Sequence, residues 1–189
     1  MKKIALLFGL AAAIPFAEAV HAAPVVPMFS GSGNVHGILL YKIKVNYDSS
    51  VESLRDQGKF SWVNESITGG NFPAKRNGEA VLDINLVSLE DIQKELNKPG
   101  QNLTLGNVLE ELDRHGLRPA ELHELLALEI QYPKRKWQYP IVALGSPGYI
   151  QWHWGSGWGF PYISSYSFGK GLFLEWHGYQ WQGDWRFAA

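Results

Sequence analysis

Hydrophobic and polar residues alternate in two segments of the first half of the chain, and this period-two pattern predicts β-strands over 37–47 and 79–87. Successive side chains of a strand point to opposite faces, so each strand has one apolar face. The expected inward-facing residues are Leu39, Tyr41, Ile43, Val45 and Tyr47 in the first strand and Leu82, Ile84 and Leu86 in the second. The segment 59–67 between them is expected to be extended or turn-like.

Apolar residues three and four apart, bounded by capping residues, predict four helices. These run from the cap at Ser49 to Gly58, from the cap at Ser88 to just before Pro99, from the cap at Thr104 to Gly116, and from Pro119 to just before Pro133. The last two helices each carry an apolar stripe. We expect both stripes to face a common core.

Beyond Pro140 the period returns to two. Residues 141–144 form a short apolar run, closed by a turn at 145–148, and a meander of short strands follows. The residues expected on its core side are Ile150, Trp152, Trp154, Tyr162, Tyr166, Phe168, Leu172, Leu174 and Trp176. The opposite face then presents Gln151, His153, Ser165, Ser167, Glu175 and His177. This polar face is a candidate site.

These elements predict one α+β domain over 37–189, with a cluster of short helices and a mixed or antiparallel sheet that ends in an aromatic-rich β-meander. Residues 1–22 have the basic start, apolar run and small-residue cleavage site of a signal peptide. The run is shorter than the ~20 residues that span a bilayer, and no later stretch is long enough. Residues 23–36, rich in Pro, Gly and Ser, are expected to be a flexible leader.

Composition narrows the class of protein. The chain has no cysteine, which argues against a lipid-anchored N-terminus and a disulfide framework. Its 17 basic and 18 acidic residues nearly balance, and no basic run is long enough to follow a phosphate backbone, so nucleic acid is not an expected partner. We expect a periplasmic or secreted protein with no membrane span after signal removal.

Aromatic residues are concentrated at the C-terminal end, where seven of the eight tryptophans lie from Trp137 onward. Exposed rings often mark contact sites. The rings expected to be exposed are Tyr149, Trp158, Phe173, Tyr179 and Trp181. With the polar face of the meander, they give the predicted ligand-binding residues Tyr149, His153, Trp158, Glu175, His177, Tyr179 and Trp181.

Two chemical alternatives use residues of the same region. His153, His177 and Glu175 could hold zinc, although surface histidines are the simpler interpretation, and we expect no metal or other cofactor. Glu175 and Asp184 could act as an acid and base pair for glycoside cleavage. No nucleophile elbow or phosphate-binding loop occurs in the sequence. His115 and His123 are expected on helix surfaces.

Several strings of the chain resemble a family of small bacterial proteins of uncharacterised function. They are Asn46-Tyr47-Asp48, Trp62-Val63-Asn64, Leu117-Arg118-Pro119-Ala120-Glu121-Leu122, Pro140-Ile141-Val142-Ala143-Leu144-Gly145-Ser146 and Trp185-Arg186-Phe187-Ala188. The resemblance implies that helices and meander form one domain. It implies no activity and no catalytic residue.

Three functional hypotheses follow. The first is a non-enzymatic binding module for an envelope glycan or protein partner, which uses the aromatic residues of the meander. The second is a glycan-directed hydrolase that uses Glu175 and Asp184. The third is a structural secreted protein without a small ligand.

Overall fold

The computed structural model describes residues 39–134, 137–153, 155–167 and 169–189. The predicted signal peptide and leader, together with Trp154 and Phe168, lie outside the described residues. In chain order the elements are β1 (Leu39–Asn46), α1 (Val51–Gly58), β2 (Trp62–Val63), β3 (Glu79–Ser88), α2 (Leu89–Glu95), α3 (Leu105–Arg114), α4 (Leu122–Gln131), β4 (Ile141–Val142), β5 (Gly148–Trp152), β6 (Gly155–Tyr166), β7 (Gly169–Trp176) and β8 (Arg186–Ala188). The predicted α+β fold is confirmed.

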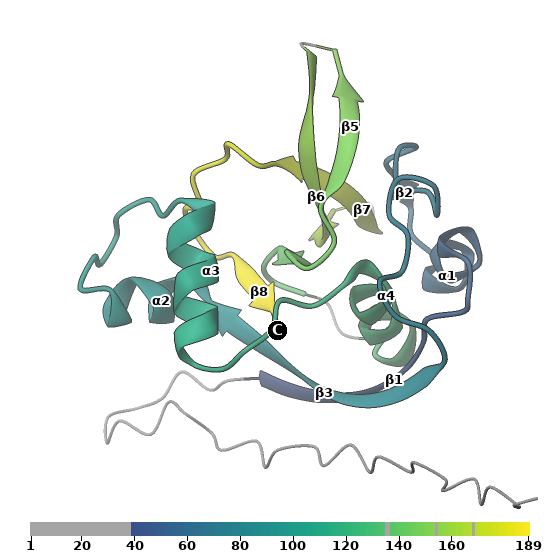
Figure 1. The fold of residues 1–189 in the computed structure, drawn as a ribbon, viewed down its shortest axis with the longest axis horizontal. Helices are drawn as coiled ribbons and strands as arrows, with labels where there is room; N and C mark the ends of the chain where they lie inside the picture. The colour runs from purple at the N-terminus through teal and green to yellow at the C-terminus, as the bar shows by residue number, and fades with distance from the viewer. Residues whose placement is uncertain (1–38, 135–136, 154, 168) are drawn as a thin grey trace, which may run out of the picture.

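The strands form one mixed sheet in the order β1-β3-β8-β4-β6-β7-β2, and β5 pairs with β6. Parallel pairs occur between β4 and β8 and between β2 and β7. The short β8 pairs with β3 on one side and with β4 on the other, so it joins the β1–β3 pair to the meander. The β5–β6 hairpin projects from the body of the domain (Figure 1).

The two faces of the sheet carry separate hydrophobic cores. Neighbouring residues of β8 show this division, because Phe187 packs in one core and Ala188 in the other. One core contains the apolar residues of α1 and α4, and the other contains those of α2 and α3. The predicted common core for the last two helices is therefore wrong, and Figure 1 shows α3 and α4 well apart.

Two helix ends differ from the sequence prediction. Helix α1 is capped by Ser50, whose side chain accepts from the Ser53 N–H, instead of by Ser49. Helix α4 begins at Leu122, three residues beyond Pro119. The reason is that the backbone of Ala120 is hydrogen-bonded to two other segments. Its N–H donates to the carbonyl of Ala188 in β8, and its carbonyl accepts from the N–H of Gly145 in the turn after β4.

Helix α4 is buried on all sides from Leu122 to Glu129. His123 is therefore buried, and its ring lies 3.1 Å from the Ser49 carbonyl, which corrects the predicted solvated position. Two carboxylates of the helix are also fully buried. Glu124 accepts from Arg118 and Tyr47, and Glu129 accepts from Lys170 and Trp137, so each charge has partners.

Candidate functional site

Strand register determines which side chains of the meander share a face. Residue Tyr149 pairs with Trp158, and Tyr162 pairs with Phe173. Directly paired residues lie on the same face of a sheet. We use the name aromatic face for the side that carries Trp62, Tyr149, Trp158, Tyr162, Tyr166 and Phe173.

Tyr162 and Tyr166 were expected on the same core side as Leu172 and Leu174, and the register contradicts this. Tyr162 packs against the other core, and Tyr166 is 39% exposed. Ile163 pairs with Leu172 in the core that contains α1 and α4, so the even-numbered residues of β6 lie on the opposite face, where Phe160 belongs to the second core. Ser165 pairs with Lys170 on the core side and leaves the predicted polar face. The register does place Gln151 and Glu175 on the aromatic face.

Phe173 is the centre of one group of rings on this face. Its ring stacks on Trp62 with centroids 4.6 Å apart and on Tyr162 at 5.2 Å. Tyr166 meets it edge-on at 6.1 Å. Trp62 and Tyr166 are 45% and 39% exposed, so this group presents ring surface to solvent.

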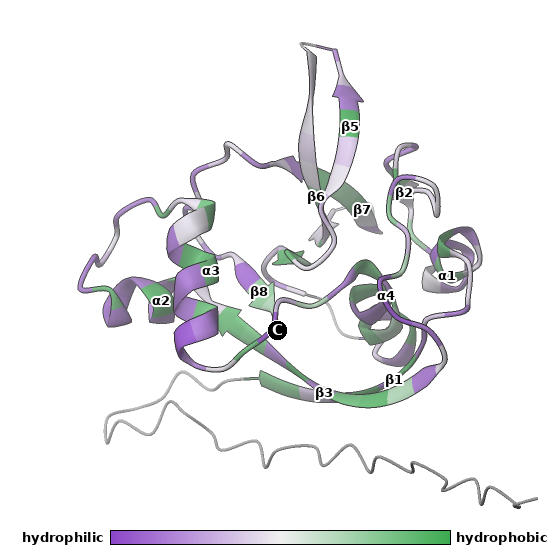
Figure 2. Ribbon diagram, viewed as in Figure 1, coloured by the Kyte–Doolittle hydropathy of each residue, from purple (hydrophilic) through white to green (hydrophobic). Residues whose placement is uncertain are grey.

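A second group lies on the β5–β6 hairpin. Tyr149 and Trp158 meet edge to face at 5.3 Å, and the Tyr149 hydroxyl lies 2.9 Å from Ser156 Oγ. Both rings are exposed. The hairpin is largely pale in Figure 2, because Trp, Tyr, Gly and Ser have intermediate hydropathy. A hydropathy scale therefore understates the aromatic surface of the hairpin.

Glu175 is a half-buried carboxylate beside these rings. Burial raises its pKa, and the Trp176 N–H, which donates to its carboxylate at 3.0 Å, opposes that rise. Burial, together with the charge of Glu175 and the nearby Tyr179, raises the pKa of Tyr162 to about 12. The Glu175 carboxyl group on the aromatic face therefore gives up its proton less readily than an exposed glutamate does.

A cleft of about 600 Å³ opens between the segment 62–66 and strand β5. Its lining residues are Trp62, Val63, Asn64, Glu65, Ser66, Ile150, Gln151, Trp152 and His153. The Trp152 ring lies against Gly159, where an added Cβ would be 3.0 Å from it, so the ring rests on bare backbone. Indole, imidazole, amide and carboxylate groups meet in this cleft, which suits a polar ligand with flat apolar faces.

The C-terminal loop places the other predicted site residues apart from these groups. Trp181 is 1% exposed, which corrects its predicted exposure, and it packs against Trp185 and Phe187. Tyr179 is half-buried against Trp181 and Trp185, and His177 is exposed beside Trp176. Asp184 lines a different cleft, around Arg186.

The described residues contain one group of side chains with the spacing of metal ligands. It consists of Glu95, Glu111 and His115, and Glu111 already pairs with Arg114 and His115. His153 and His177 do not belong to such a group within the described part of the chain.

Sequence reasoning missed Trp62, Tyr162 and Tyr166 as members of the site. A signal was present in β6, where Gly157 and Gly159 alternate with the aromatic residues. Glycines leave room for neighbouring rings on their own face, so they mark the side covered by Trp152 and Trp176.

Comparisons with known proteins gave no relatives: no family model matches the chain, and no match was found among curated proteins or solved structures. In the described residues, no helix has the length and apolar character needed to cross a membrane.

Proposed function

We propose that this protein is an exported binding module that docks an envelope glycan or protein partner on its aromatic face. The observation that carries the proposal is that Trp62, Tyr149, Trp158 and Tyr166 are exposed on one side of the meander. Exposed aromatic surface gathered on one face is typical of contact sites. Their rings combine large apolar area with polar atoms at the edge.

A glycan fits this surface better than a purely apolar partner. Sugar rings offer C–H faces that stack on aromatic rings and hydroxyl groups that need hydrogen-bonding partners. Ser156, Gln151 and Glu175 lie among the rings and supply such groups. Asn64 and Glu65 supply more in the adjoining cleft.

The direct test is tryptophan fluorescence of the chain from residue 23 onward, titrated with peptidoglycan fragments, chitin oligosaccharides and cellulose oligosaccharides. A saturable shift with one glycan class supports the proposal. Silence with every glycan, in protein shown by circular dichroism to be folded, would direct the search to a protein partner or to a structural role.

One observation favours a hydrolase as the second candidate. The raised pKa of Glu175 is the property that a general acid needs near neutral pH. Asp184, the second carboxylate of that hypothesis, lines the Arg186 cleft. Reducing-sugar release from the bound glycan, lost in Glu175→Gln while binding is retained, would support the enzyme.

A further inference from the structure

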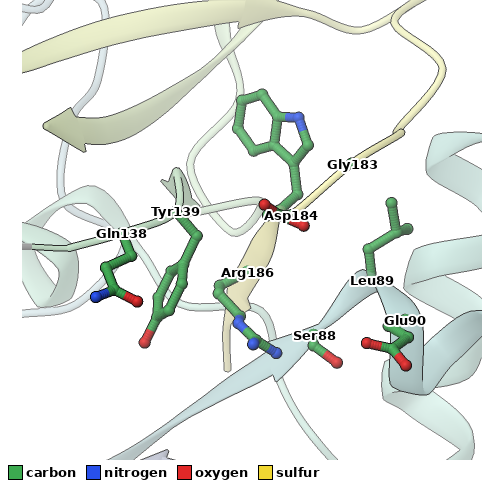
Figure 3. Close-up of a pocket in the computed structure, with 9 residues that line it drawn as sticks. Ser88, Leu89, Glu90, Gln138, Tyr139, Gly183, Asp184 and Arg186 are labelled. Atoms are coloured by element: carbon green, nitrogen blue, oxygen red, sulfur yellow. The ribbon is translucent and has the colours of Figure 1, made fainter. Parts of the chain in front are cut away.

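Arg186 on β8 reaches into a cleft of about 250 Å³ that is separate from the aromatic face. The cleft is lined by Ser88, Leu89, Glu90, Gln138, Tyr139, Gly183, Asp184, Trp185 and Arg186. Figure 3 shows the Arg186 side chain between the Tyr139 ring and Ser88, with Glu90 beyond Ser88 and Asp184 toward the loop above. The guanidinium lies 4.7 Å from the centroid of Tyr139, a contact that fixes its plane.

The hydrogen-bonding capacity of Arg186 is not used within the described residues. Its Nε atom is buried without a hydrogen-bond partner, and no carboxylate lies within ion-pair distance of the guanidinium. The Nε atom is closed off from solvent, so an incoming ligand would meet the two Nη nitrogens, which have no hydrogen-bond partner among the described residues.

The guanidinium of Arg186 indicates that the ligand carries a carboxylate. Its donors form a planar fork that matches the two oxygens of a carboxylate. The Ser88 hydroxyl donates to Asp91, so it is already engaged. Arg186 is the one cationic side chain among the residues that line the cleft.

The acidic residues of the cleft indicate that the ligand also carries a positively charged group. Glu90 pairs with Lys94 at 2.7 Å, which offsets its charge. Asp184 is exposed and forms no ion pair or side-chain hydrogen bond among the described residues. A simple anion on Arg186 would be repelled by Asp184, whereas a ligand that also carries an ammonium group would be attracted by both residues.

We propose that this cleft binds a small zwitterion, a free α-amino acid, with its carboxylate on Arg186 and its ammonium group toward Asp184. The size agrees, because 250 Å³ holds about eight water-sized groups at ~30 Å³ each. The site is independent of the proposed glycan surface. It gives a role to the Arg186 side chain, which forms no ion pair within the described residues.

Isothermal titration with glycine, acetate and methylammonium at neutral pH tests the charge pattern. Glycine should bind saturably, and each single-charge probe should bind at least about tenfold more weakly because it engages one of the two charged residues. Acetate binding as tightly as glycine, or no binding of glycine at millimolar concentration, would overturn the proposal.

Two variants assign the two ends of the ligand. Asp184→Asn removes an exposed charge and should weaken glycine about tenfold while acetate binds as before or more tightly. Arg186→Lys keeps the charge but removes the fork, and it should weaken glycine and acetate alike. Asp56→Asn, an exposed acid on α1, is the control and should change neither affinity. Unchanged glycine binding in Asp184→Asn, which does not disturb the core, would refute the zwitterion site even if Arg186→Lys failed to fold.

Discussion

Glu175 lowers the stability of the folded protein by an amount that depends on pH. Its folded-state pKa is raised by burial, so the folded chain holds this proton more readily than the unfolded chain does. Stability therefore falls as pH rises from the ordinary glutamate pKa, ~4.3, through the folded value, and stays lowered above it.

Replacement of Glu175 by glutamine should remove this cost. Because the group is partly exposed and screened, we expect a rise in Tm of roughly 1–2 °C at pH 7, under about 1 kcal/mol. The rise should disappear near pH 3, where the carboxyl group is protonated in both states. Thermal unfolding followed by circular dichroism at both pH values measures the difference, and Glu110→Gln on the exposed side of α3 is the matched control. A larger rise at pH 3 than at pH 7 would contradict the assignment.

Glu124 illustrates the opposite case of a buried charge with partners. Its carboxylate accepts from both Arg118 Nη atoms at 2.7 and 3.0 Å, from the Tyr47 hydroxyl and from the Glu121 N–H at 2.7 Å. Burial, with the hydrogen bond to this carboxylate next, raises the pKa of Tyr47. Removal of the carboxylate would leave several donors without an acceptor.

We therefore expect Glu124→Ala to lower the free energy of unfolding by about 3–5 kcal/mol. Glu110→Ala, at an exposed position, should change it by less than about 0.5 kcal/mol. Urea unfolding of the two variants measures both values. A similar small loss in both would show that the Arg118–Glu124 pair is not a structural requirement.

At the scale of elements, the Gly145-Ser146 pair joins the turn after β4 to the start of α4. The Gly145 N–H donates to the Ala120 carbonyl, and Ser146 Oγ accepts from the Leu122 N–H. A Cβ on Gly145 would lie 2.4 Å from the Pro119 carbonyl oxygen and 2.6 Å from that of Ala120. The turn thus holds the start of α4 against the end of β4.

Gly145→Ala should separate these elements. Because the added methyl group meets backbone atoms that cannot rotate away, we expect a loss of about 1–3 kcal/mol, the usual cost of overpacking. Gly70→Ala is the matched control, since the nearest atom to its Cβ is 3.8 Å away. Chemical denaturation compares the two, and equal stability of both variants would refute the role of the turn.

Elements with strong local patterns were predictable from the sequence. The alternation in β1, with Lys42 and Lys44 exposed between buried residues, and the cap of α2 at Ser88 are confirmed. The orientation of β6 was not predictable, because a strand flanked by strands on both sides presents apolar residues to two cores. Only the pairing of Ile163 with Leu172 decides which face is which.

At the scale of the whole molecule, the position of β8 was beyond local reasoning. Its three residues lie between β3, a hundred residues earlier in the chain, and β4. No local signal in Arg186-Phe187-Ala188 indicates so central a position. Phe187 and Ala188 of β8 contribute to the two different cores. Asp184, two residues before Arg186, lines the Arg186 cleft, and Glu175 does not.

The candidate site was predicted in part for the same reason. Its location in the meander followed from ring density. Tyr149 and Trp158 were expected to be exposed because they fall off the expected core face or in a glycine-rich segment, and these are local properties too. Trp62 joins the surface only because β2 pairs with β7, more than a hundred residues further along the chain. Trp181 left the predicted site because Leu103 forms a bridge with it and the loop folds inward.

The most direct test of the account compares two tryptophans of similar exposure on opposite faces of the meander. Trp158, 47% exposed, lies on the aromatic face, and Trp176, 42% exposed, lies on the other. Co-sedimentation with purified peptidoglycan, chitin and cellulose should show that the wild-type protein binds one of them. Trp158→Ala should weaken that binding at least about tenfold, and Trp176→Ala should leave it within about twofold. Equal losses in both variants, or binding that survives in Trp158→Ala, would contradict a binding site on the aromatic face.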